Sequence, residues 1–348
     1  MSTNLEHLWM PFSANRGFKS EPRLMNEAKG MYYKKLDGTK VMDGTAGLWC
    51  CNAGHGNEKI VKAIQDQAAK LDFAPSFQMG HPLAFEAAEK LLSIAPSNDF
   101  QYTFFTNSGS EAVDTALKIA LGYQHHRGKT DKTILIGRER AYHGVGFGGI
   151  SVGGLPLNKK HFSLLPSVDH ICATHNLEKN AFSKGQPEWG KELAEDLLQV
   201  IEKHGADKIA AFITEPLAGS TGVLVPPKGY LERIREICTQ NDILLIFDEV
   251  ITGFGRLGAP FAAQYFDVEP DMITCAKGLT SGTIPMGAVL VKKEIYDAFQ
   301  DGDANSIDLF HGYTYSAHPM AAAALIASLD VYTEDNLFER TNELASYW

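Results

Sequence analysis

From about residue 101 onward, the sequence alternates between short apolar runs rich in β-forming residues and stretches with helical periodicity. This alternation is typical of strands that are joined by helices, as in βαβ units. The expected strands cover residues 101–106, 133–136, 209–214, 243–247, 272–276 and 286–291, and the expected helices cover residues 110–123, 191–203 and 229–240. Strands this apolar are usually covered on both faces, so we predict an α/β fold with a mainly parallel central sheet between helices on both faces.

The segment before residue 50 has a different pattern. Its short runs are separated by Asp-Gly turn signals at residues 37–38 and 43–44, which predict a small β-meander. A chain of 348 residues is expected to form about two domains. We therefore predict that residues 1–49 belong to a small α+β domain, that residues 50–318 form a large domain, and that residues 319–348 return to the small domain.

Composition excludes several classes of partner. The formal net charge of −10 argues against a broad basic surface, so we expect no nucleic acid and no anionic lipid as partner. The longest apolar run, residues 320–327, is far shorter than the roughly 18 residues of a membrane span, and the N-terminus lacks a signal-peptide pattern. The five cysteines are scattered without C-x-x-C spacing, as is typical of free thiols in a reducing compartment. The sequence thus predicts a cytoplasmic protein with no metal site.

Three of the predicted strands end in a charged residue. Glu215, Asp248 and Lys277 each come directly after such a strand. In open α/β sheets the carboxyl ends of the strands form the edge that binds ligands. A single charge at this position is often only the exposed end of a strand, but two acids and a lysine together favour a shared site.

The strand at 101–106 leads into the sequence NSGSEA at residues 107–112, and then into a predicted helix. The free N–H groups and the positive dipole end of a helix N-terminus, together with serine hydroxyls, can hold a phosphate group. The same residues also suit an ordinary N-cap through Ser108 or Ser110. A cap and a phosphate site are compatible.

Together these features match pyridoxal phosphate. This cofactor needs an amine for a Schiff base, a carboxylate at its pyridine nitrogen and an anion site for its phosphate. Lys277, Asp248 and residues 107–112 supply one of each. At an effective dielectric constant near 20, a carboxylate about 4 Å from the ring nitrogen favours the protonated ring by about 4 kcal/mol, or about three pKa units.

A competing motif lies at residues 144–149, which fit the G-x-G-x-x-G pattern of dinucleotide-binding folds, with Asp169 about 20 residues further on. That pattern requires a strand before the glycines and a helix after them. Residues 138–143 lack a strand pattern and residues 150–156 lack a helix start, so we expect a flexible loop there. A nicotinamide-dependent dehydrogenase is therefore the weaker alternative. Residues 156–188 have little periodicity and are expected to cross the surface or an interface.

Five motifs follow one another along the chain. They are NSGSEA at 107–112, YHG at 142–144, EP at 215–216, DEVITGFGRLG at 248–258 and AKG at 276–278. In this order and spacing they resemble the class III aminotransferases, and the resemblance covers nearly the whole chain. Within that class the sequence is most similar to the ω-amino acid:pyruvate (β-alanine:pyruvate) aminotransferases, through WMPF at 9–12, GLW at 47–49 and HGYTYSAHP at 311–319.

The resemblance implies a fold, a cofactor and an assembly. The family has fold type I of the pyridoxal-phosphate-dependent transferases and forms homo-oligomers, at least dimers. By this resemblance, Lys277 forms the Schiff base and moves the substrate proton, while Asp248 pairs with the ring nitrogen. Gly109 and Ser110 would hold the phosphate, joined by Thr314 of the neighbouring subunit.

The resemblance also implies the remaining walls of the site. Tyr142 would stack on one face of the ring, and Val250 would pack on the other. Leu48 and Trp49 would line the substrate pocket, although a tryptophan at this position also suits an ordinary core. The other cofactor-site residues implied by the motifs are Ser108, His143 and Glu215, the last lying behind the direct contacts.

Two positions differ from the ornithine and γ-aminobutyrate branch of the family. That branch carries a glutamate after the glycine of its E-P-x-x-G-E run and a glutamine two residues after its D-E pair, where this chain has Ser220 and Ile251. The difference favours pyruvate over 2-oxoglutarate as the amino acceptor. Family members also continue beyond the equivalent of residue 348 with a subdomain that supplies an arginine for the substrate carboxylate. Because the helical pattern at 336–348 is cut short, we expect a C-terminally truncated small domain, as in a fragment.

We therefore expect a transaminase that uses pyridoxal 5'-phosphate to move the amino group of an ω-amino acid or amine, such as β-alanine, to pyruvate, giving alanine. One alternative is another class III aminotransferase, of the diaminopelargonate or diamine type. A second is an inactive, truncated remnant that still binds the cofactor. A panel of amino donors distinguishes the first, and cofactor binding without a half-reaction would indicate the second.

Overall fold

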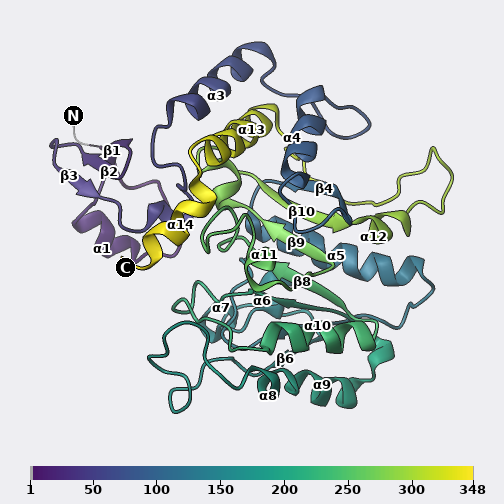
Figure 1. The fold of residues 1–348 in the computed structure, drawn as a ribbon. Coiled ribbons are helices and arrows are strands. Elements are labelled where there is room, and N and C mark those ends of the chain that lie inside the picture. Colours follow the sequence, from purple (N-terminus) through teal and green to yellow (C-terminus); the bar gives the residue numbers. More distant parts are fainter. Residues whose placement is uncertain (1–2, 348) are drawn as a thin grey trace.

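The computed structural model describes residues 3–347 and contains two β-sheets (Figure 1). Met1, Ser2 and Trp348, which belong to the predicted terminal segments, lie outside the described residues. A three-stranded sheet lies near the N-terminus, and a seven-stranded sheet forms the centre of the molecule.

The small sheet is the predicted β-meander. Its strands are β1 (Met25–Lys29), β2 (Tyr32–Lys35) and β3 (Lys40–Met42), and both pairs are antiparallel. Every residue of β1 is exposed, and no residue of β2 or β3 is buried. Because burial of apolar surface is the main stabilising contribution in a sheet, this meander has little intrinsic stability.

The large sheet has the strand order β4-β10-β9-β8-β7-β5-β6. Its strands are β4 (Phe100–Thr106), β5 (Ile134–Arg138), β6 (Val168–Ile171), β7 (Ile209–Thr214), β8 (Leu244–Asp248), β9 (Met272–Cys275) and β10 (Gly287–Lys292). The neighbours from β9 to β6 are parallel, whereas β10 is antiparallel to both β9 and β4. The predicted α/β fold with a mainly parallel sheet is confirmed. Sequence patterns missed only β6 among these strands, because it is short and polar and lies within the aperiodic stretch 156–188.

The helices surround this sheet. They are α1 (Asn15–Ser20), α2 (Ala46–Trp49), α3 (Glu58–Lys70), α4 (Pro82–Leu92), α5 (Gly109–His126), α6 (Phe147–Val152), α7 (Pro156–Lys159), α8 (Gly190–Ala194), α9 (Asp196–His204), α10 (Tyr230–Gln240), α11 (Ala262–Phe266), α12 (Lys293–Asp297), α13 (Pro319–Glu334) and α14 (Leu337–Ala345), with the 3₁₀ turns η1 (Ala206–Lys208) and η2 (Lys277–Thr280). The helices predicted at 110–123 and 229–240 correspond to α5 and α10, and the one predicted at 191–203 is divided at Glu195 into α8 and α9.

The sequence predicts a flexible loop at residues 144–149, but this segment is not wholly a loop. Its last residues begin the short helix α6. The Gly149 N–H donates a 2.8 Å hydrogen bond to Asp114 of α5, and a Cβ atom on Gly146 or Gly148 would lie within 3 Å of the same carboxylate. The glycines therefore allow α6 to pack closely against α5, and tertiary contact rather than local periodicity produces this helix.

Alternate side chains of the central strands pack against different helices. Phe212 and Phe247 lie in a core cluster with residues of α10, whereas Ile213 and Ile246 lie in a second cluster with residues of α5. Successive side chains of a strand point to opposite faces, so the two clusters mark the two faces of the sheet. Helices cover both of them, as predicted (Figure 1).

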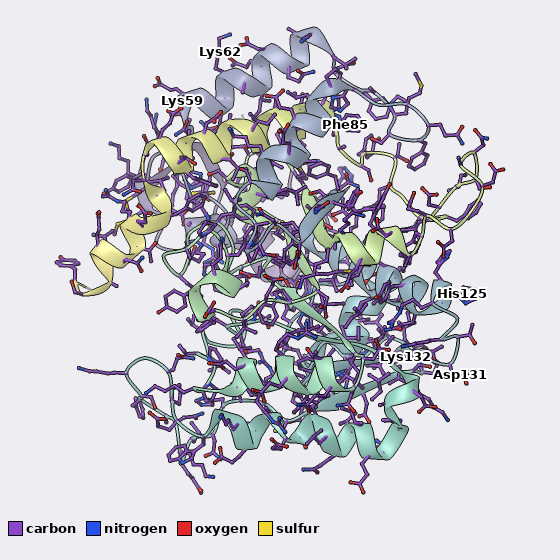
Figure 2. The ribbon with its side chains drawn as sticks, turned by 45° about the vertical axis from the view of Figure 1, so that its right-hand side comes forward. Lys59, Lys62, Phe85, His125, Asp131 and Lys132 are labelled. Atoms are coloured by element: carbon purple, nitrogen blue, oxygen red, sulfur yellow. The ribbon has the colours of Figure 1, made fainter. Side chains whose placement is uncertain are left out.

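The apolar helix α13 packs against α3 and α4. Ile60 of α3 is fully buried and forms a small core cluster with Val331 of α13. Lys59 of α3 forms an ion pair with Glu334 of α13, and Figure 2 shows Lys59 and Lys62 on the outer side of α3. None of the helices in the described part of the chain is long and apolar enough to cross a membrane.

Candidate active site

A cavity of about 290 Å³ lies at the carboxyl ends of β7, β8 and β9. Glu215, Asp248 and Lys277 all line it, so the three charged strand ends face one space. The other lining residues are Asn107, Ser108, Gly109, Ser110, Tyr142, His143, Gly144, Val250, Ile251, Ala276, Thr280, Gly282, Ile284, Pro285 and Met286. The N-terminus of α5 thus borders the same cavity as the acids and the lysine.

The strand register brings these side chains together. The strands β7, β8 and β9 are buried along their whole length, and parallel pairing aligns their carboxyl ends. Asp248 is the last residue of β8 and pairs with Thr274 of β9. Burial on both faces leaves these strands a single register, which fixes where the polar ends lie.

Three neighbours hold the Asp248 carboxylate. The Nδ1 atom of His143 lies 2.7 Å from Oδ2, the N–H of Val250 donates to Oδ1 at 3.1 Å, and Thr274 Oγ1 donates to Oδ1 at 3.3 Å. A carboxylate only accepts hydrogen bonds, so His143 carries its proton on Nδ1. Its Nε2 atom is buried without a hydrogen-bond partner in the described residues. Thr274 was missed by sequence reasoning, because a threonine within a buried strand is unremarkable until its neighbour across the sheet is known.

Glu215 lines the cavity and also holds the loop that carries Tyr142. Its carboxylate accepts hydrogen bonds from the N–H of Tyr142 at 3.0 Å and from the N–H of Gly219 at 2.9 Å. Burial raises the pKa of this carboxyl, and the nearby His143 opposes the change. Glu215 therefore both faces the cavity and fixes the backbone beside it.

The N-terminus of α5 is capped through side chains. Ser108 Oγ accepts a 3.2 Å hydrogen bond from the N–H of Glu111, and the Glu111 carboxylate accepts a 2.7 Å bond from the N–H of Asn107. The N-cap expected from the sequence is therefore present. The N–H groups of Gly109 and Ser110 come before the first intrahelical bond, which runs from the Ala112 N–H to the Ser108 carbonyl, so they have no partner within the helix.

Two glycines permit close approach at this end of the cavity. A Cβ atom on Gly109 would lie 2.8 Å from Cγ1 of Val250, and one on Gly144 would lie 2.5 Å from Oγ of Ser110. Gly144 also has a φ of +83°, in the left-handed region that other residues rarely adopt. With the Val145 N–H donating to Ser110 Oγ at 3.1 Å, backbone and hydroxyl groups form a compact, donor-rich wall.

Lys277 begins η2, one residue beyond the end of β9. Its φ of +48° places a non-glycine residue in the left-handed region, a strain that folded proteins tend to retain at functional sites. Burial lowers the pKa of the lysine, and the charges of Asp248, Cys50 and Glu215 oppose this effect. The amine is therefore easier to deprotonate than an ordinary lysine and more available as a nucleophile.

Three predicted site residues are not among those that line the cavity. Leu48 is 79% exposed, Trp49 is half-buried, and Thr314 is exposed. Sequence reasoning in turn missed the segment Ile284, Pro285 and Met286, which precedes β10 and closes one side of the cavity. Apolar residues before a strand carry no chemical signal, so only the fold could reveal their place.

Comparison with known proteins identifies the family. Residues 13–348 match the family described as aminotransferase class-III. The chain belongs to the class III aminotransferases. It is 60% identical to an omega-aminotransferase of Caulobacter vibrioides, over 100% of this chain and 79% of that protein. It is also 49% identical to a beta-alanine–pyruvate aminotransferase of Pseudomonas aeruginosa, over 99% of this chain and 77% of that protein.

Solved structures of omega-transaminases have the same fold as this chain. An omega-transaminase from Pseudomonas jessenii, solved in complex with PMP, superposes with a TM-score of 0.90 and 34% identity, covering 98% of this chain and 76% of that one. The class III aminotransferases depend on pyridoxal phosphate. The residues of the cavity fit such a group, since they combine one half-buried lysine, one carboxylate held by three donors and one glycine-lined helix N-terminus.

Proposed function

We propose that this aminotransferase binds pyridoxal 5'-phosphate and moves the amino group of an ω-amino acid such as β-alanine to pyruvate, giving alanine. The observation that carries the proposal is the convergence of Lys277, Asp248 and the N-terminus of α5 on one cavity. The choice of substrates is supported by two relatives, at 60% and 49% identity, whose names describe omega-amino and β-alanine–pyruvate transfer.

The chain's own groups suit each part of the cofactor. Asp248 would face the ring nitrogen, held in orientation by His143 and Thr274. Ser108, Gly109 and Ser110 would hold the phosphate at the positive end of α5. Tyr142 would cover one face of the ring and Val250 the other, both being at the cavity wall. When bound, pyridoxal phosphate supplies an electron sink that stabilises the charge released at the substrate carbon.

Lys277 acts as both attachment point and proton carrier in this proposal. Its side chain is half-buried and its pKa is lowered, so its amine can attack a carbonyl carbon at neutral pH. Once released from that bond, the same Nζ atom can take a proton from the substrate carbon and return it at the neighbouring position. The short turn η2 keeps the amine at the cavity during both steps.

A second copy of the chain completes the site in this proposal. Thr314 is exposed and lies away from this chain's own cavity, as expected if it contributes to the phosphate site of a partner. Large exposed apolar side chains gather on the same segment and on α4 and its approach, and Figure 2 shows Phe85 on α4. They are Phe77, Met79, Phe85, Phe310 and Tyr315. Burial of such a set against a second copy would stabilise a homo-oligomer.

Two further predictions remain proposals. We retain the division into residues 1–49, 50–318 and 319–348, which is supported by the separate small sheet within the first of these segments. We also retain Leu48 and Trp49 as substrate-pocket residues, supported by their position on α2 next to Cys50, which borders the cavity wall at Gly282. A cytoplasmic location remains a prediction of the sequence.

A panel of amino donors and acceptors tests the proposed function. Purified holoenzyme should form alanine from β-alanine and pyruvate, and should form little glutamate when 2-oxoglutarate replaces pyruvate. Putrescine and γ-aminobutyrate serve as alternative donors at equal concentration. Faster alanine formation from the diamine than from β-alanine would favour the diamine type instead. A bound chromophore that β-alanine leaves unchanged would indicate an inactive cofactor-binding protein.

A further inference from the structure

Two adjacent thiols lie at the edge of the cavity and have no role in the proposed reaction. Cys50 and Cys51 follow α2, and their Sγ atoms lie 3.9 Å apart, within reach of an S–H···S contact. Both are half-buried. A Cβ atom on Gly47 would lie 3.1 and 3.2 Å from the two sulfurs, so the backbone of this glycine packs against both. The turn at the end of α2 thus holds the sulfurs together.

Cys50 also borders the cavity wall. A Cβ atom on Gly282, which lines the cavity, would lie 3.0 Å from Cys50 Sγ. The next residues tie this segment to the cavity loops, because Asn52 Nδ2 donates to the Phe254 carbonyl at 2.8 Å and the Ala53 N–H donates to Ser281 Oγ at 3.0 Å. The thiol pair therefore lies between the small sheet and the turn that carries the catalytic lysine.

Arg256 lies close to the pair, on the neighbouring Asn52, and has no acidic partner in the described residues. Arg256 donates from Nη2 to Asn52 Oδ1 at 2.9 Å, its Nε atom is buried without a partner, and no described carboxylate forms an ion pair with it. The groups that favour its charge are Tyr332, Cys50 and Cys51. A buried cation is costly without a counter-charge, and a thiolate at this position would supply one.

The surroundings distinguish the two thiols. Either sulfur can donate in their contact, and donation from Cys51 stabilises a Cys50 thiolate. This contact, a backbone hydrogen bond at Leu48 and the charges of Lys277 and Arg256 lower the pKa of Cys50. The pKa of Cys51 is raised by the same hydrogen bond, by burial and by the nearby thiolate and Asp43. The remaining ionisable neighbours are two phenols, Tyr33 of β2 near both thiols and Tyr332 of α13 near Cys51 and Arg256. Neither bears a charge at neutral pH.

We propose that Cys50 and Cys51 form a reversible oxidation site, in which Cys50 reacts with a hydroperoxide and Cys51 then forms a disulfide with it. In the first step the Cys50 thiolate attacks the peroxide, so that an S–O bond forms, the O–O bond breaks, and one proton completes the sulfenic acid and the alcohol or water that leaves. In the second step the Cys51 sulfur attacks, so that the S–S bond forms, the S–O bond breaks, and water leaves with the thiol proton. The two electrons lost by the sulfurs reduce the peroxide.

The adjacency of the two residues predicts that the disulfide is easily reduced. Neighbouring Cα atoms are about 3.8 Å apart across a trans peptide, below the usual spacing in disulfides. Strained disulfides have more oxidising potentials and belong to the labile, regulatory class. A dithiol reductant should therefore restore both thiols.

The other thiols of the chain provide internal controls. Cys172 is half-buried like the pair, but burial and the carboxylate of Asp196 raise its pKa to about 11. Cys238 is fully buried, and burial raises its pKa to about 12. Cys275 is also buried. Thiolate reactivity at neutral pH should therefore be concentrated at Cys50.

The experiment treats holoenzyme at pH 7 with hydrogen peroxide, alkylates the remaining thiols, and follows each cysteine peptide by mass spectrometry. The peptide that contains residues 50 and 51 should lose two hydrogen atoms and regain them with dithiothreitol. In Cys51→Ser, dimedone should trap a sulfenic acid on Cys50, whereas Cys50→Ser should leave Cys51 unmodified. Without peroxide, iodoacetamide should alkylate Cys50 at least about tenfold faster than Cys172.

A charge series tests the role of Arg256. Arg256→Gln should slow alkylation of Cys50 at pH 7 by about twofold, and Arg256→Lys, which keeps the charge, should largely restore it. Equal reactivity of Cys50 and Cys172, or trapping of Cys51 in place of Cys50, would overturn the proposal. These readouts need no turnover, so they stand or fall separately from the proposed transamination.

Discussion

The two sheets of this protein differ in what holds them in place. Within the large sheet, β7, β8 and β9 are buried along their whole length, and their ends carry Glu215, Asp248 and Lys277. Within the small sheet, no strand contains a buried residue. The proposed cofactor machinery therefore lies on the part of the chain whose geometry is fixed by its own core.

Polar contacts to His55 connect the small sheet to the chain that follows it. His55 forms a two-way backbone bridge with Gly30, and its Nε2 atom lies 2.7 Å from Oδ2 of Asp43. Asp43 in turn accepts a 2.7 Å hydrogen bond from the N–H of Gly47. The segment from Asp43 to His55, which contains the two adjacent thiols, thus joins a weakly packed sheet to a rigid one. The proposed reaction needs fixed positions for the residues at the strand ends. The segment from Asp43 to His55 is packed more weakly, so a chemical modification of its thiols can change its conformation.

The largest expected effect comes from removing the amine at the rigid sheet. Lys277→Ala should abolish turnover and the visible absorbance of the covalently bound cofactor, because no other described lysine lines the cavity. Borohydride reduction followed by peptide mapping should place the pyridoxyl adduct on residue 277 in the parent protein. A pyridoxyl adduct on another lysine would contradict the proposed site.

A smaller effect is expected at the neighbouring strand end. Asp248→Asn keeps an acceptor for Val250 and Thr274 but removes the negative charge, so the half-reaction should slow by about a thousandfold, from about three pKa units of lost stabilisation of the ring. Stopped-flow absorbance measures the half-reaction, and the covalent adduct at Lys277 should still form. A rate within tenfold of the parent would mean that this acid does not face the ring nitrogen.

Stability measurements test the difference between the sheets directly. Phe247 of β8 is fully buried, so Phe247→Ala should lower the free energy of unfolding by about 3–5 kcal/mol. Tyr32 of β2 is 48% exposed, and Tyr32→Ala should change the free energy of unfolding by no more than about 0.5 kcal/mol. Urea unfolding followed by circular dichroism provides both values. Comparable losses would show that the small sheet contributes to the same cooperative core.

The smallest effect concerns pH. Burial raises the pKa of Glu249 to about 7, although hydrogen bonds from Ala263, Ala262 and Thr252 favour its charged form. The folded state then keeps a proton that the unfolded chain releases near pH 4.3, so this stabilising contribution is complete below that pH and is lost as the pH rises through about 7.

Thermal unfolding at several pH values measures this contribution. The Tm of the parent protein should fall between pH 5 and pH 8, and Glu249→Gln should flatten that fall. Glu27→Gln on the exposed strand β1 is the matched control and should leave the slope unchanged. Equal slopes in the parent protein and Glu249→Gln would contradict the assigned titration.

Most of the proposed cofactor side of the cavity could be predicted because it lies at strand ends. A buried strand such as β8 is a continuous apolar run, so the polar residue that ends it is conspicuous. The helix α6 and the strand β6 were not predictable, since one depends on contact with Asp114 and the other on pairing with β5. The position of Thr274 beside Asp248 likewise depends on register across the sheet.

The sequence by itself determined the chemical groups and the class of fold, because residue types and their periodicity are local properties. Only the tertiary structure decided which of those groups share a space. It brought Lys277, Asp248 and the start of α5 to one cavity and left Thr314 on the surface. It also placed Arg256 beside the thiols of Cys50 and Cys51, about two hundred residues earlier in the chain, a distance over which no local pattern carries information.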